Sequence, residues 1–184
     1  MKKYEFTGET KVFSTLFRTV TLHQIRATVA FGLVAAGEVG GWIEKEENLS
    51  HSGKAWVWGN AKVWGNAKVC GDAEVWGNAK VCGDAEVWGN AKVCGDAKVF
   101  SASHILVIGA IGSRDDFTTF YRDKDNEITV KCGCFLGKID KFLAKVAQTH
   151  GDSKYALVYR AAVEVAKLQI DLTGEAPKED NQDA

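Results

Sequence analysis

Lysine and aromatic side chains recur at a fixed spacing in the middle of this 184-residue chain. Lys62, Lys80 and Lys98 lie 18 positions apart, and Trp64 and Phe100 each stand two positions after one of them. Ammonium groups beside aromatic rings can bind a nucleotide or a short anionic strand through charge and stacking. The pattern predicts a candidate anion-binding surface, and the alternative is a solvated row of lysines that binds nothing.

Tryptophans in the same stretch predict a second surface. Five of the six tryptophans stand at positions that we expect to point outward, where core packing does not explain them. Exposed apolar side chains of this size usually mark an interface. The alternative is that the rings stack on one another and are covered by the C-terminal segment. The candidate interface residues are Trp56, Trp58, Trp76 and Trp88.

An internal repeat must position these residues. From Ser52 to Val99, eight consecutive hexapeptides follow the frame x-Gly-(Asn/Asp/Lys)-Ala-x-Val without an insertion. Alanine and valine are two positions apart, so they share one face of a short strand, and the glycine with its Asn or Asp neighbour makes the corner. Such units can bury their apolar face only by coiling on one another. The repeat therefore predicts a β-helix.

The repeat resembles that of the hexapeptide-repeat proteins. That resemblance implies a left-handed parallel β-helix with 18 residues per coil, and here about three to four coils over residues 39–100. The preceding segments Arg26-Ala27, Gly40–Glu46 and Asn48–Ser50 resemble those of uncharacterised hexapeptide-repeat proteins of bacteria and their phages. A phage origin would imply an inhibitor of a host defence complex.

A coil of 18 residues also predicts the environment of the cysteines. Cys70, Cys82 and Cys94 are 12 positions apart, so they fall on three different faces, beyond the ~7 Å between Cα atoms that a disulfide allows. Cys132-Gly133-Cys134 could be half of a redox or metal site. These two cysteines alternate with Ile128 and Val130, which favours buried strand residues instead. We therefore predict no metal site and no cofactor.

The chain after Phe100 leaves the repeat. Strands are predicted at His104–Ile108, Phe117–Tyr121 and Glu127–Phe135, followed by two amphipathic helices that end near His150 and Ile170, the second capped by Asp152. This part should close the open end of the β-helix. The predicted organisation is an N-terminal β cap over 1–38, the β-helix over 39–100, strands and helices over 101–172, and a disordered acidic tail over 173–184.

The resemblance also raises the possibility of an enzyme. Many hexapeptide-repeat proteins are acyltransferases that use a histidine as general base and a loop that leaves the β-helix. The eight repeats contain neither, and only His51 and His104 flank them. We therefore predict a non-catalytic protein without catalytic residues, and acyl transfer is the alternative.

Composition limits the remaining classes of protein to which the chain could belong. The chain is 46% apolar with a net charge of −1, which fits a folded domain and gives no bulk charge for nucleic acid. No apolar run approaches the ~18 residues of a membrane span. We predict a cytoplasmic β-helical binding protein that forms a dimer or trimer and binds a protein partner, with nucleotide or nucleic-acid binding as a second alternative.

Overall fold

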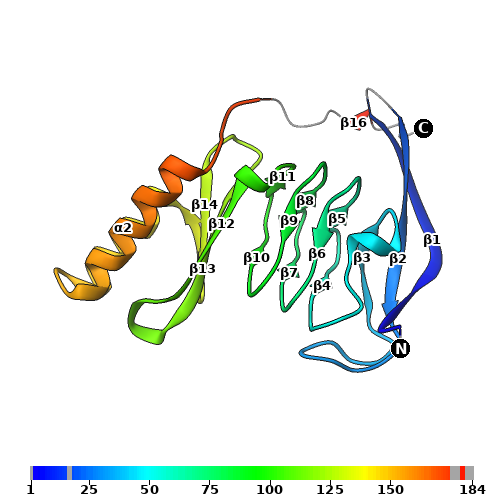
Figure 1. Ribbon diagram of the computed structural model, residues 1–184, viewed down its shortest axis with the longest axis horizontal. Helices are drawn as coiled ribbons and strands as arrows, with labels where there is room; N and C mark the ends of the chain where they lie inside the picture. The colour runs from blue at the N-terminus through cyan, green and yellow to red at the C-terminus, as the bar shows by residue number, and fades with distance from the viewer. Residues whose placement is uncertain (1, 16–17, 175–178, 181–184) are drawn as a thin grey trace.

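The computed structural model describes residues 2–15, 18–174 and 179–180. The molecule is elongated: a β-hairpin lies at one end, a stack of coils in the middle, and a small sheet with two helices at the other end (Figure 1). No helix in the described part of the chain is long and apolar enough to cross a membrane.

The eight repeats form the coils of a parallel β-solenoid. Strands one coil apart pair in parallel with an offset of 18 residues, as between Lys62 and Lys80 or between Lys68 and Glu86. This confirms the predicted mainly β fold, with a solenoid of about three turns and two C-terminal helices. Its strands are β4 (Trp56–Val57), β5 (Lys62–Val63), β6 (Lys68–Val69), β7 (Glu74–Val75), β8 (Lys80–Val81), β9 (Glu86–Val87), β10 (Lys92–Val93) and β11 (Lys98–Val99).

The repeat frame explains the interior and the corners of the solenoid. The alanine and valine of every unit are fully buried and form one continuous core. The corners stack so closely that a side chain does not fit at Gly53: an added Cβ would lie 2.3 Å from the carbonyl oxygen of Gly71. At other corners the Asn/Asp alternation forms hydrogen bonds: Asn66 donates to Asp84 over 3.0 Å, and Asn78 donates to Asp96 over 3.2 Å.

The N-terminal segment extends one face of the solenoid. Strands β1 (Tyr4–Thr15) and β2 (Thr19–Ala27) form an antiparallel hairpin, and β3 (Val39–Ile43) joins it to β5. The 3-10 helix η1 (Glu46–Asn48) follows. There the buried amide of Asn48 donates to the carbonyl oxygens of Ala67 and Gly65 over 2.8 and 3.2 Å and accepts from the Lys45 N–H.

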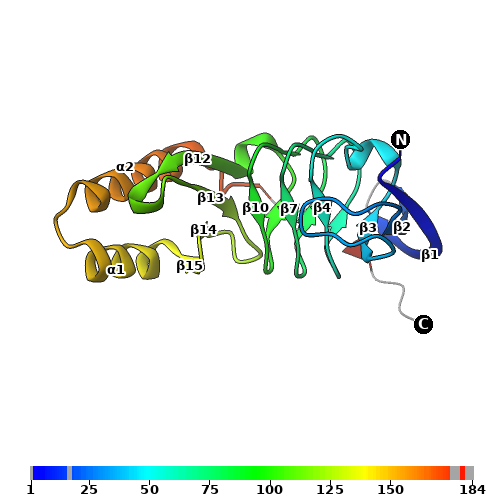
Figure 2. The same ribbon diagram turned by 90° about the horizontal axis from the view of Figure 1, so that it is seen from below.

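A four-stranded antiparallel sheet closes the other end. Tyr121 on one face joins the solenoid core, whereas Phe120 on the opposite face packs with the helices. Figure 2 shows the sheet between the solenoid and the two helices, so the sheet is the cap and the helices cover its outer face. The elements are η2 (Ala102–His104), β12 (Ile105–Ile111), η3 (Gly112–Arg114), β13 (Asp116–Arg122), β14 (Ile128–Cys132), β15 (Phe135–Lys138), α1 (Ile139–His150) and α2 (Lys154–Gln169).

Two local predictions for this region are wrong. The predicted strand Glu127–Phe135 is interrupted, because Gly133 has φ +54° and turns the chain from β14 into β15. The second helix is preceded by Ser153, not capped by Asp152, and no side chain bonds its first turn.

The predicted acidic tail lies mostly outside the described residues, namely at 175–178 and 181–184. Strand β16 (Glu179–Asp180) pairs with the end of β1, where Thr15 faces Glu179.

Candidate functional site

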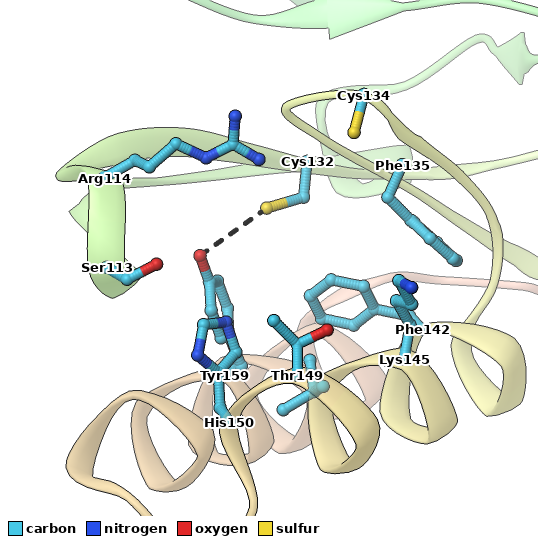
Figure 3. Close-up of a pocket in the computed structure, with 11 residues that line it drawn as sticks. Ser113, Arg114, Cys132, Cys134, Phe135, Phe142, Lys145, Thr149, His150 and Tyr159 are labelled. Atoms are coloured by element: carbon cyan, nitrogen blue, oxygen red, sulfur yellow. Dashed lines mark hydrogen bonds between the residues drawn. The ribbon is translucent and has the colours of Figure 1, made fainter.

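A cavity of about 420 Å³ lies in the C-terminal cap, between the β14–β15 turn, η3 and the two helices (Figure 3). Its size is within the range of small-molecule sites. Apolar rings form one side of it, and thiol, hydroxyl, imidazole and cationic groups converge from the other sides. The lining residues are Ser113, Arg114, Cys132, Cys134, Phe135, Phe142, Lys145, Val146, Thr149, His150 and Tyr159.

The thiol of Cys132 is held at the end of β14 by two hydroxyl groups. The buried Thr118 donates a hydrogen bond to the sulfur over 3.3 Å, and the thiol lies 3.8 Å from the Tyr159 hydroxyl, to which it donates. Burial, together with the neighbouring Cys132, raises the pKa of Tyr159 to about 12. The phenol therefore stays protonated at neutral pH and remains a donor.

Two glycines allow this arrangement. Gly112, with φ +78°, lets the Tyr159 hydroxyl reach η3, because a Cβ there would lie 1.9 Å from that oxygen. Gly133 makes the turn against which the guanidinium of Arg114 packs. A Cβ added to Gly133 would lie 3.1 Å from a guanidinium nitrogen of Arg114. His150 ends α1, and its ring centroid lies 5.7 Å from that of Tyr159.

The charges around the cavity are of one sign. Arg114 and Lys145 are exposed cations at its rim, and no described residue that lines it carries a carboxylate. Asp116 lies near enough to act on the pKa of Tyr159 but does not line the cavity. The half-buried Cys132 thiol therefore shares its cavity with two cations, and a thiol can act as the nucleophile in covalent catalysis.

This cavity is not predicted by the sequence pattern. The alternation around Cys132 and Cys134 favours buried strand residues, and this is wrong: Cys132 is half-buried at the end of β14, and Cys134 is exposed in the turn. His150 and Tyr159 were interpreted as parts of helices only. The closely spaced cysteine pair around a glycine was the one available signal.

The predicted tryptophan surface is exposed only in part. Trp56 has no exposed surface, because Phe31 packs on it with ring centroids 5.4 Å apart and Tyr4 lies 6.2 Å away. Trp58 and Trp76 are partly buried against the solenoid core, whereas Trp88 is 66% exposed. The expected exposure of Trp56 is therefore wrong, and its cover comes from the N-terminal segment, not the C-terminal one.

The predicted lysine ladder is present, but its rings are covered. Lys62, Lys80 and Lys98 pair in register and are half-buried. Trp64 is 4% exposed beneath Phe13, whose ring centroid is 5.4 Å away. Phe100 is half-buried and packs against His104 and beside the guanidinium of Arg122, with distances of 4.1 and 4.8 Å. Trp64 is therefore not an open stacking platform, and anion binding at this face stays a prediction.

The two flanking histidines lie in structural positions. His104 is buried and accepts a hydrogen bond from the Phe100 N–H; burial and then Arg122 lower its pKa. His51 stacks on Tyr4 at 4.2 Å and accepts from the Lys3 N–H. Neither histidine lines the cavity in the cap. Among the residues that the structure describes, no group of three or more His, Cys, Asp or Glu side chains could hold a metal ion.

Comparison with known proteins gives one informative similarity. The chain is 37% identical over 62 residues to the "Uncharacterized acetyltransferase YdcK" of Escherichia coli (strain K12). The match covers 32% of this chain and 19% of that protein, so this chain spans only a small part of its relative's length. No family model matches the sequence. The predicted absence of enzymatic activity is contradicted by this similarity to a protein named as an acetyltransferase.

Proposed function

We propose that this protein transfers an acyl group from a thioester donor and that the acyl group binds in the cavity of the C-terminal cap. One observation carries the proposal: the Cys132 thiol faces this cavity between two hydroxyl groups, close to cationic side chains. The similarity to a named acetyltransferase supports the reaction class.

The chemistry would proceed as thioester exchange followed by transfer. The Cys132 sulfur attacks the carbonyl carbon of the donor, a new C–S bond forms, and the donor C–S bond breaks. The donor thiol leaves with the proton that Cys132 loses. An amine or hydroxyl acceptor then takes the acyl group and returns its proton to Cys132. The hydrogen bond from Thr118 orients the Cys132 sulfur, and the protonated Tyr159 can donate to the carbonyl oxygen.

Acetyl-CoA tests this proposal. The intact protein should release free CoA and gain one acetyl group, and peptide mass spectrometry should locate that group on Cys132. Cys132→Ala should abolish acetylation, whereas Cys70→Ala, at a half-buried cysteine of the solenoid outside this cavity, should retain it. Absence of CoA release, or equal release by the two variants, would contradict the proposal.

Self-association and binding to a protein partner, including a host defence complex, form a second candidate function. The observation that favours it is Trp88, which is largely exposed on the solenoid. Light scattering should then detect more than one protomer, and Trp88→Asp should shift the protein toward the monomer. A monomeric wild-type protein at high concentration would rule out self-association.

A further inference from the structure

The charge around the cap cavity departs from the charge of the whole chain. The protein has 23 Lys and Arg against 24 Asp and Glu, so a surface chosen at random would carry both signs. The cavity carries Arg114 and Lys145 at its rim, while no carboxylate belongs to its described lining. Such a cavity favours an anionic ligand.

The opposite side of the cavity is apolar and rigid. Phe142 is buried and packs against Phe135 and Tyr159, with ring centroids 5.2 and 5.5 Å apart. Val146 completes this side. Rings that pack on one another in this way offer a preformed contact surface for a short alkyl chain.

In Figure 3, Arg114 and Lys145 approach from opposite sides, and the Cys132 thiol points toward the Tyr159 hydroxyl. A guanidinium binds a carboxylate through two parallel hydrogen bonds, which gives both strength and orientation. A ligand with one end at the thiol can therefore place a terminal carboxylate at a cation.

We propose that the cavity binds a short-chain carboxylate, with its alkyl part against Phe135, Phe142 and Tyr159 and its carboxylate at Arg114 or Lys145. Where this site also performs the proposed transfer, the preferred acyl group is a dicarboxylic one that keeps a free carboxylate. The binding itself does not require the transfer step.

Calorimetry with the full chain tests the ligand class. Glutarate and valerate should both bind more tightly than 1,5-pentanediol, because the two acids carry a carboxylate and the diol, which has the same number of carbons, carries none. The affinity for glutarate should fall as salt increases. Removal of the cation that holds the carboxylate, by Arg114→Gln or by Lys145→Gln, should weaken glutarate binding by about tenfold, as expected for one lost charged hydrogen bond. Lys141→Gln, on α1 but outside this cavity, is the matched control.

The outcomes separate this inference from the proposed function. Glutarate binding without release of CoA from acetyl-CoA or glutaryl-CoA keeps the ligand class and overturns the transfer. Transfer from acetyl-CoA without glutarate binding, and without preference for glutaryl-CoA, keeps the transfer and overturns the ligand class. Equal binding of glutarate and pentanediol, or unchanged glutarate binding by both Arg114→Gln and Lys145→Gln, would also overturn the ligand class.

Discussion

The buried guanidinium of Arg122 donates a hydrogen bond to the carbonyl oxygen of Thr173 over 2.6 Å. It also donates to the carbonyl oxygen of Gly174 over 2.5 Å and twice to Asn126. The side chain comes from β13, whereas Thr173 and Gly174 follow α2. Arg122 therefore fixes the chain beyond the last helix onto the sheet that caps the solenoid.

Replacement of Arg122 should weaken the cap. Arg122→Met leaves the carbonyl groups of the segment beyond α2 without their charged donor, which should lower the free energy of unfolding by about 2–3 kcal/mol. Urea denaturation measures this change. Arg160→Met, at an exposed position on α2, should stay within about 0.5 kcal/mol of the wild type. Equal losses in the two variants would contradict the role of Arg122.

His104 should make the free energy of unfolding fall with pH in the mildly acidic range. Its pKa in the folded protein is lowered by burial and then by Arg122, so the unfolded chain binds a proton more readily. The free energy of unfolding is therefore highest above the unfolded pKa of about 6.5, and it falls as pH drops below that value, because only the unfolded chain then binds the proton. His104→Gln should reduce the fall in unfolding free energy between about pH 6.5 and pH 5. An unchanged slope in this variant would assign the pH dependence to other groups.

Two tryptophans of the solenoid should differ sharply in their contribution to stability. Trp56→Ala removes a fully buried ring beneath Phe31 and Tyr4 and should cost about 3–5 kcal/mol. Trp88→Ala removes an exposed ring and should change the unfolding free energy by no more than about 0.5 kcal/mol. Thermal and urea unfolding of the pair measure the contrast. Similar costs would mean that the N-terminal segment does not cover Trp56 in solution.

Asn48 should stabilise the fold at the point where the chain enters the solenoid. Its amide bonds the backbone of the next coil at Ala67 and Gly65, so Asn48→Leu leaves buried backbone groups unpaired. The expected loss is about 1–3 kcal/mol in unfolding free energy. Asn60→Ala, at an exposed corner, is the control and should have a small effect. An unchanged free energy of unfolding in Asn48→Leu would show that water replaces these hydrogen bonds.

The repeat by itself determined the central architecture. Because each hexapeptide places Ala and Val on one face and Gly with Asn or Asp at a corner, the buried core and the corners follow from local pattern. The 18-residue register, which pairs Asn66 with Asp84, is what the resemblance to hexapeptide-repeat proteins implies. The two C-terminal helices follow in the same way from their apolar spacing. These features depend on neighbours in the sequence or on an exact repeat, so one pattern specifies them.

Only the tertiary structure decided which outward residues are covered and where the cavity lies. Phe31 covers Trp56 and Phe13 covers Trp64 because the N-terminal hairpin and the loop after it fold back onto the solenoid. Cys132 and Tyr159 meet because β14 ends at the turn of Gly133, which lies beside η3, and α2 packs against η3. Such contacts join segments far apart in the chain, and no periodicity within either segment encodes the distance between them.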